Sequence, residues 1–501
     1  MVDRNPYTNL SMKKIILLLL VHLSVMTSSH SQDIAEFSKG GKIHRQVLAL
    51  WDNHYRDYWT SEIKRRLIDD GDVYVLYDVQ IGGLQSFVEM NRRCGDTKQL
   101  KEIVAMLNPV FAQLRPIADQ GKGWICTGGT ICPAYNLLDK EVPLCSSQFL
   151  GLLGAVATAV TDVIPAQEWG EAEQTFLRQT ANTMAVHLNR WLTPSYFRAT
   201  ERRAQVTKED ITDGSSRSFF TDRDLWYLTI LSDLAELHQK GIIPLEEDGI
   251  LAWNELQQKK KGIGISFDLF IKRISLASTP SGNAADLDKG YWRHFYDNRY
   301  ARYDGEEKPV VWESNSEGAT MVVQVPWDSA YLSPDAGWDI SHARRLVPAL
   351  ESFARNQQTI RSVWGYENPA FDPIEIRRSF AVQIVEKIWN KDKDYPLFTN
   401  FWSGDNGWYR VAYAAQTGRQ FSGYPPFGLS NSIPEGGYPI WGTLHPTLDH
   451  LFRRLYELGQ SEDETDRRFM SQHYSRLMLK DQGNAKRVPS FSFLSDLVES
   501  R

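Results

Sequence analysis

Apolar residues recur every three or four positions along most of the chain, which is the spacing of amphipathic helices. The segment 43–68 is typical, with Val47, Leu50, Trp51 and Tyr58 on one stripe. By the same criterion, further helices are predicted over residues 72–91, 97–115, 146–163, 166–192, 221–241, 286–300, 372–389, 445–458 and 461–480. The chain therefore reads as mainly helical.

Local signals mark where some of these elements begin. Thr221 and Asp224 have the spacing of a capping box, and Asp372 precedes a proline as an N-cap would. The segment Val310–Val325 alternates β-branched residues around a glycine and is the best strand candidate. Residues 198–218 are polar and charged, which predicts an excursion over the surface.

About a dozen helical segments without a strand–helix rhythm predict an all-α fold with a small β element. The helices have lengths suited to antiparallel hairpins joined by long loops. No exact repeat of 20 to 50 residues is present. A toroid of helical hairpins remains compatible, because structural repeats need not share sequence.

The composition of the chain indicates the class of ligand and says little about the fold. The chain has 501 residues and a net charge of -6, which gives no electrostatic reason to expect a nucleic-acid partner. It also has 16 Trp, 21 Tyr and 22 Phe. Trp and Tyr in loops are good platforms for the apolar faces of sugars, although a large helical core also uses many aromatics.

The first 31 residues have the pattern of a signal peptide. Two lysines, Lys13 and Lys14, precede the apolar run 15–26, and small residues follow up to Ser31. Met12 is a possible true start. The apolar run is too short for a stable membrane anchor, and no later stretch reads as transmembrane. We therefore expect an exported protein, periplasmic or extracellular, without stable membrane insertion.

The four cysteines fit an oxidising compartment. Cys94, Cys126, Cys132 and Cys145 lie in one short region and allow three pairings. Cys126 and Cys132 flank a glycine-rich loop and are the first choice for a pair. Zinc is disfavoured because there is no Cys-x-x-Cys and no helical histidine pair. No metal or cofactor is expected, and the sequence does not constrain the oligomeric state.

The first candidate site is the stretch 337–345, called here the first cluster. It holds Trp338, Asp339, His342 and Arg345 where a loop becomes a helix. Asp339 and His342 could act as general acid and base, Arg345 could hold an anionic or hydroxylated ligand, and Trp338 could stack on a sugar. The structural alternative is an N-cap, a core histidine and an ion pair.

The stretch 400–410, the second cluster, is the other candidate. Asp405 is the best single carboxylate for proton chemistry, and Asn406 can bond sugar hydroxyls. Trp402, Trp408 and Tyr409 offer stacking surfaces. The structural alternative is an Asp-Asn-Gly turn followed by core aromatics.

Further candidates lie outside the two clusters. A glycosidase needs a second carboxyl group, and Glu313, beside a tryptophan, is preferred over Glu317 and the loop aspartates. The loop 423–441 is rich in Gly, Pro and aromatics and is predicted to form a rim of the cleft. Three of its residues or neighbours are candidate substrate contacts: Tyr438, Trp441 and His445.

The export signal, the helix count and loops ending in Trp-Asp-x-Ser-His and Gly-Asp-Asn-Gly-Trp-Tyr resemble the (α/α)-toroid carbohydrate-active proteins. These include the six-hairpin glycosidases and related polysaccharide lyases. The resemblance covers the architecture of most of the chain. It implies one toroid domain over residues 32–480 after a signal peptide (1–31), with residues 481–501 as a tail. It also implies a cleft at one end of the toroid.

The predicted function is glycoside hydrolysis of an oligo- or polysaccharide. Asp405 would pair with Asp339 or Glu313 across the scissile bond. One alternative is a polysaccharide lyase acting on a uronic-acid glycan, with His342 or Tyr409 as the base and Arg345 or Asn406 neutralising the carboxylate. Another is a glycan-binding protein without catalysis, which would keep the aromatic platforms and lack a carboxyl pair.

Overall fold

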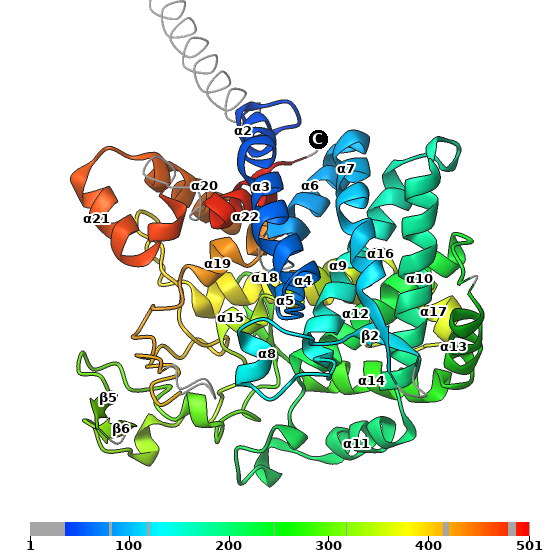
Figure 1. Ribbon diagram of the computed structural model, residues 1–501. Coiled ribbons are helices and arrows are strands. Elements are labelled where there is room, and N and C mark those ends of the chain that lie inside the picture. Colours follow the sequence, from blue (N-terminus) through cyan, green and yellow to red (C-terminus); the bar gives the residue numbers. More distant parts are fainter. Residues whose placement is uncertain are drawn as a thin grey trace, which may run out of the picture.

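The computed structural model describes residues 36–79, 83–117, 121–244, 246–316, 318–413, 420–478 and 487–499. The predicted signal peptide and Glu317 lie outside these residues. The described chain is mostly helical, with strands only in small hairpins, so the all-α prediction is confirmed (Figure 1). The toroid arrangement stays a prediction.

The predicted helix 43–68 is confirmed as one continuous helical rod. Its α-helical parts α2 (Lys42–Leu50), α3 (Arg56–Tyr58) and α4 (Arg65–Ile68) alternate with π-helical turns over 51–55 and 59–64. The wider turns have a reason in the sequence. Its buried residues recur strictly every four positions: Trp51, Tyr55, Trp59, Ile63 and Leu67. An α-helix with 3.6 residues per turn would rotate this stripe away from the core, and π turns compensate.

Helix α9 (Pro143–Val163) lies at the centre of the fold and packs on α12 (Asp222–Gln239). Its small residues permit close contact, since a Cβ at Gly151 would lie 2.5 Å from the ring of Trp226. Among the described helices, α9 is the one long and apolar enough to span a membrane. However, 89% of its apolar window is buried within the protein, as in a core helix.

Other helices surround this pair (Figure 1). Helices α10 and α16 pack on α12, and α6 and α7 pack on α9. The remaining α-helices have these bounds: α5 Val75–Val79, α6 Gln85–Cys94, α7 Thr97–Leu107, α8 Ile131–Ala134, α10 Glu171–Trp191, α11 Pro194–Gln205, α13 Glu247–Gln258, α14 Lys260–Arg273, α15 Ile340–Ala343, α16 Leu346–Arg355, α17 Gln357–Trp364, α18 Pro373–Gln383, α19 Ser432–Glu435, α20 Pro446–Gln460 and α21 Glu464–His473.

The C-terminal segment is not the loose tail that was expected. Helix α22 (Arg487–Leu497) packs between α2 and α6, with Phe491, Phe493 and Leu494 almost fully buried. Its serines mask the apolar pattern, but they bond inside the protein. Ser492, for example, lies 3.0 Å from the hydroxyl of Ser86. The end of the chain therefore completes the core.

Three antiparallel hairpins supply all strands of the described residues: β1 (Leu114–Pro116) with β2 (Lys122–Trp124), β3 (Ile274–Thr279) with β4 (Gly282–Leu287), and β5 (Val310–Asn315) with β6 (Gly318–Val323). The strand prediction at 310–325 is confirmed, as a hairpin. The helix predicted over 286–300 is wrong. Residues 286 and 287 belong to β4. The turns that follow are held by a distant partner, because the N–H groups of Gly290 and Trp292 both donate to the carbonyl of Ala336. The excursion predicted from residue 198 is helical as far as Gln205.

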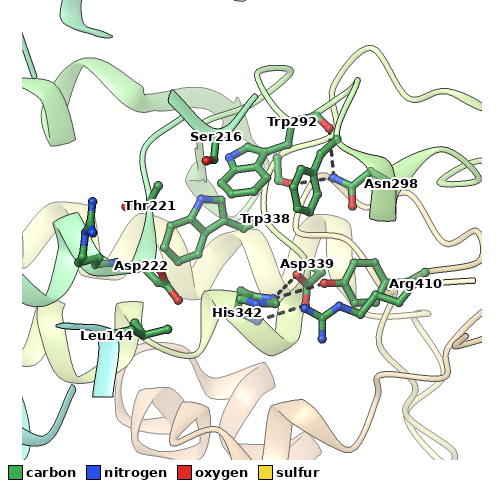
Figure 2. Close-up of a pocket in the computed structure, with 14 residues that line it drawn as sticks. Leu144, Ser216, Thr221, Asp222, Trp292, Asn298, Trp338, Asp339, His342 and Arg410 are labelled. Atoms are coloured by element: carbon green, nitrogen blue, oxygen red, sulfur yellow. Dashed lines mark hydrogen bonds and ion pairs between the residues drawn. The ribbon is translucent and has the colours of Figure 1, made fainter. Parts of the chain in front are cut away.

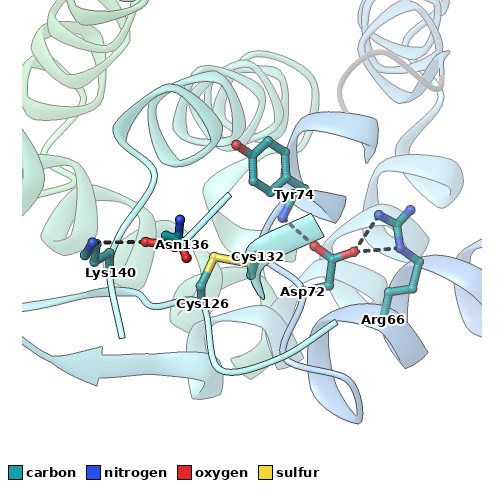
Figure 3. Close-up of a disulfide and its surroundings, with 7 residues drawn as sticks. All are labelled: Arg66, Asp72, Tyr74, Cys126, Cys132, Asn136 and Lys140. Atoms are coloured by element: carbon teal, nitrogen blue, oxygen red, sulfur yellow. Dashed lines mark hydrogen bonds and ion pairs between the residues drawn. A yellow bond between two sulfur atoms is a disulfide. The ribbon is translucent and has the colours of Figure 1, made fainter. Parts of the chain in front are cut away.

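The disulfide forms between Cys126 and Cys132, as predicted, with their Cα atoms 5.9 Å apart (Figure 3). It closes the loop next to the turn that holds Asp72, whose carboxylate accepts hydrogen bonds from Arg66 and from the backbone of Tyr74. Cys94 and Cys145 are buried and are not disulfide-bonded.

Candidate functional site

A cavity of about 410 Å³ opens where five separated parts of the chain meet (Figure 2). The residues come from the start of α9, from the loop and first turn of α12, from the turns after β4 and from both candidate clusters. They are Leu144, Ser216, Thr221, Asp222, Arg223, Trp292, Phe295, Asn298, Gly337, Trp338, Asp339, His342, Tyr409 and Arg410.

Asp339 and His342 form a dyad in this cavity. Asp339 is the N-cap of the single-turn helix α15, and its Oδ1 accepts from the backbone N–H groups of Ser341 (3.0 Å) and His342 (3.1 Å). The hydroxyl of Ser341 also donates to it. The other oxygen, Oδ2, lies 2.6 Å from Nδ1 of His342. The cap therefore also fixes the imidazole, and Nε2 is left as its second functional nitrogen.

The electrostatics of the dyad keep Asp339 ionised. Burial opposes ionisation, but the charge of His342 and the hydrogen bonds from His342 and Ser341 hold the pKa of Asp339 well below its usual range. His342 keeps a third of its side chain exposed. Asp339 is thus the N-cap that the structural alternative anticipated, and its carboxylate also orients His342 at the cavity wall.

The two clusters meet in space. Backbone hydrogen bonds join them, from Ile340 N–H to Asn400 oxygen (3.0 Å) and from Trp402 N–H to Trp338 oxygen (2.9 Å). The hydroxyl of Tyr409 lies 3.4 Å from Nδ1 of His342. Because of these contacts, the end of the second cluster faces the dyad of the first.

Tyr409 and Arg410 are the members of the second cluster that line the cavity. Burial, together with the charge of Asp339, raises the pKa of Tyr409 well above its usual range, so the phenol stays protonated. Arg410 has a left-handed backbone (φ 55°), and its Nε lies 3.0 Å from the carboxylate of Asp297. Burial raises the pKa of Asp297, although Arg410 opposes this. Sequence reasoning missed Arg410 and Asp297, whose pairing spans more than a hundred residues.

One wall of the cavity is aromatic. Trp338, predicted to contact substrate, lines it together with Trp292 and Phe295, which sequence reasoning did not single out. Trp292 donates its indole N–H to Asp288 (2.6 Å), whereas the buried indole N–H of Trp338 has no partner among the described residues. An apolar aromatic wall suits a ligand with apolar ring faces.

Arg345 lies behind the cavity instead of lining it. It is buried, donates to the hydroxyl of Tyr77 (2.9 Å) and lies 3.5 Å from the carboxylate of Asp222. Asp222 itself lines the cavity. Arg345 thus helps to position Asp222. This contact agrees with the structural alternative, in which Arg345 forms an ion pair.

The other predicted substrate contacts do not line this cavity. Trp402 is fully buried and donates to the carbonyl of Ala285, and Trp408 donates to the carbonyl of Gly305. The side-chain oxygen of Asn406 accepts from the backbone of Asn400 (3.3 Å) and Phe427 (2.8 Å). These side chains hold a buried loop together.

The same holds for the aromatic loop after residue 423. Tyr438 donates to the carbonyl of Ile340 (3.0 Å), and Trp441 donates to Glu351 (3.1 Å). His445 is the N-cap of α20, where its Nδ1 accepts from Thr447. Each has a structural partner, so the predicted rim packs against the fold and does not contribute to the cavity.

The expected carboxyl pair is not assembled around this cavity. Asp405 is bound by the hydroxyls of Ser403 (2.7 Å) and Ser333 and by Arg302 (3.2 Å). Glu313 is exposed on strand β5, opposite Thr320. Neither lines the cavity. Both acids were chosen for their neighbours in sequence, and tertiary contacts place them elsewhere.

One group of potential metal ligands occurs in the described residues, at His44, Cys94 and Asp96, whose ligand atoms lie within 4.8 Å of one another. Lys39 also lies there, with its ammonium 3.4 Å from Asp96. A cation would be repelled by this ammonium, and His44 already bonds Asp96 (2.8 Å). The group reads as a buried polar cluster that anchors α2.

Comparison with known protein families, curated proteins and solved structures gives no match to this chain. The function is therefore inferred from the geometry of the cavity.

Proposed function

We propose that the cavity is the active site of a polysaccharide lyase that cleaves a uronic-acid glycan by β-elimination. The observation that carries the proposal is the Asp339–His342 dyad facing the protonated Tyr409. Hydrolysis was the first expectation from the sequence, and lyase activity was its alternative.

In the proposed reaction, His342 is the base. Asp339 holds Nδ1 as the donor, so Nε2 can accept the proton from C5 of the uronate ring. The electron pair left on C5 forms the C4=C5 double bond, and the bond between C4 and the glycosidic oxygen breaks. No water is added, and the new chain end is unsaturated.

Tyr409 is the proposed acid. Its phenol is protonated and can give its proton to the departing glycosidic oxygen. After the product leaves, the Nε2 proton of His342 passes to water and the phenolate takes a proton from water. Both residues then return to their starting states, with Nδ1 still donating to Asp339, and no cofactor is needed.

The carboxylate of the uronate must be neutralised as negative charge develops beside it. Arg223 and Arg410 both line the cavity. Arg223 is exposed, and its guanidinium has no carboxylate partner among the described residues, so it can pair with a ligand carboxylate. Trp338 and Trp292 would support the ring.

Hydrolysis remains the second candidate because Asp222, like Asp339, lines the cavity. Asp339 accepts four hydrogen bonds and is held ionised, which makes it a poor proton donor. A hydrolase would then need Asp339 as nucleophile or base and Asp222 as acid. The products distinguish the two reactions, since only elimination gives an unsaturated uronate.

The test is a panel of polymers: alginate, polygalacturonate, glucuronan and hyaluronan, with neutral dextran as the control. Elimination is followed by the ultraviolet absorbance of the conjugated double bond. We expect absorbance to rise with a uronate polymer and to stay flat with dextran. Binding of uronate polymers without any cleavage would instead favour the glycan-binding alternative. Export through the predicted signal peptide is part of the proposal, and the disulfide is compatible with it.

A further inference from the structure

A second hollow, here called the arginine groove, continues from the cavity. It has a volume of about 820 Å³ and shares Ser216, Thr221 and Arg223 with the cavity wall. Its other walls come from the end of α10, from α11 and from the loop before α12. A ligand longer than one ring could therefore pass from the cavity into the groove.

The charge of this groove is one-sided. Five arginines line it, and no Asp or Glu does: Arg190, Arg202, Arg203, Arg217 and Arg223. In a chain with a net charge of -6, this is a local concentration of positive charge.

Not all five arginines are available to a ligand. Arg190 lies 2.9 Å from Glu141, and Arg203 is buried and bound to Asp224 (2.9 Å). Arg202, Arg217 and Arg223 are exposed, and their guanidinium groups have no hydrogen bond or ion pair within the part of the chain that the structure describes. Guanidinium groups that the protein leaves unpaired along one groove can form bidentate contacts with carboxylate or sulfate groups.

The groove also has aromatic walls. Trp191 and Tyr227 stack with their ring centroids 5.0 Å apart, and Tyr196 packs edge-on against Tyr227. Trp191 is half-buried, so it exposes part of an indole to the groove. Apolar ring surface between guanidinium groups matches a chain of acidic sugars, in which ring faces alternate with anionic substituents.

We infer that the arginine groove binds the anionic sugar units next to the bond that is cleaved, so that the protein recognises an acidic polysaccharide over several residues. The inference rests on the proposed function, which places one uronate in the cavity. Arg223 would be the junction, and Arg202 and Arg217 would hold further units. Two consequences follow: affinity increases with the number of anionic sugars, and it falls as salt is added.

The test compares two variants of the full chain. In Arg202→Ala/Arg217→Ala, both changes are at exposed positions, so folding should be retained. The control is Arg178→Ala, because Arg178 is exposed on α10, has no ion pair among the described residues and does not line the groove. Binding is measured by calorimetry with oligogalacturonides and oligoalginates of two and six units and with a neutral dextran hexamer.

We expect the double variant to bind uronate hexamers about tenfold more weakly, with little change for dimers, and the control to behave like the wild type. Unchanged hexamer affinity in the double variant would overturn the inference. So would a single-stranded DNA of equal charge that binds more tightly than every uronate hexamer. If hexamers bind through these arginines but no unsaturated product forms, the proposed reaction fails and the groove stands.

Discussion

The first cluster (337–345) and the second cluster (400–410) have similar residue types, yet the fold uses them differently. In the first, Trp338, Asp339 and His342 all line the cavity. In the second, only Tyr409 and Arg410 reach it, and Trp402, Asn406 and Trp408 bond to the surrounding backbone.

The difference follows from where each backbone finds its hydrogen bonds. The first cluster starts a helix, and one side chain serves its free amides, because Asp339 accepts from the N–H groups of Ser341 and His342. The second cluster is irregular and largely buried. Its peptide groups need side-chain partners, and Asn400 and Asn406 supply them. Polar side chains in a buried loop form hydrogen bonds with the backbone of the loop and its neighbours, so they are not available to bind a ligand.

The largest effect is expected at His342. His342→Ala removes the proposed base and should lower the rate of elimination about a thousandfold while leaving the fold intact. His450→Ala is the matched control, because His450 is exposed on α20 and does not line the cavity. Rates for the double-bond product, with circular dichroism for folding, measure both. Equal rates for the two variants would remove His342 from the reaction.

Asp339→Asn comes next. Asparagine still caps α15, so stability should change little, but it no longer fixes the tautomer and charge of His342. We expect the rate to fall about a hundredfold with KM nearly unchanged. If KM alone changes, Asp339 contacts substrate and does not orient the histidine.

Strand β4 contacts both clusters, since Gly337 packs closely against its end and the indole of Trp402 donates to the carbonyl of Ala285. Burial raises the pKa of Asp286 to about 8, and neither carboxyl oxygen has a partner among the described residues. The folded state therefore keeps a proton that the unfolded chain releases above about pH 4, so stability falls as pH rises from 4 to 8. Asp286→Asn should abolish this decline.

The advantage of Asp286→Asn should be near zero at pH 4 and on the order of 3 kcal/mol at pH 7. Denaturant unfolding at several pH values measures it. Parallel pH profiles for the variant and the wild type would show that Asp286 is ionised in the folded protein.

A smaller loss of stability is expected at Asn406. Asn406→Ala leaves the backbone N–H groups of Asn400 and Phe427 without their acceptor, which should cost about 2 kcal/mol. The activity of the folded fraction should stay close to normal. A normal melting temperature combined with a loss of activity would instead make Asn406 a substrate contact, as the sequence first suggested.

The smallest effect is expected at Glu313. Because it is exposed on β5 and does not line the cavity, Glu313→Gln should change the rate by less than about twofold. A large loss of activity would mean that the hairpin β5–β6 approaches the substrate.

Much of the fold could be predicted because its signals are local. Apolar spacing predicted the rod from α2 to α4, and the capping box at Thr221 and Asp224 marked the start of α12. Helix α22 was missed because its serines break the apolar pattern. Ser492 bonds the distant Ser86, and Ser495 donates to the carbonyl of Phe491 one turn back.

In the candidate site, too, only the features with a local signal could be predicted from the sequence. The members of the Asp339–His342 dyad are three positions apart, within one helix turn, so their spacing was visible. The pairing of Arg410 with Asp297 and the fate of Asp405 depend on contacts between distant segments. No local pattern distinguishes a carboxylate bound by the fold from one that faces a cavity.

Elimination is distinguished from hydrolysis most sharply by measuring whether solvent oxygen enters the products when a uronate polymer is cleaved. The wild-type protein is incubated with the polymer in water enriched in heavy oxygen, and the products are weighed by mass spectrometry. Elimination at the His342 site predicts products without solvent oxygen, of which the unsaturated one has the mass of the hydrolysis product minus one water. The His342→Ala variant should form no product. Incorporation of one heavy oxygen per cleaved bond would contradict the account and establish hydrolysis.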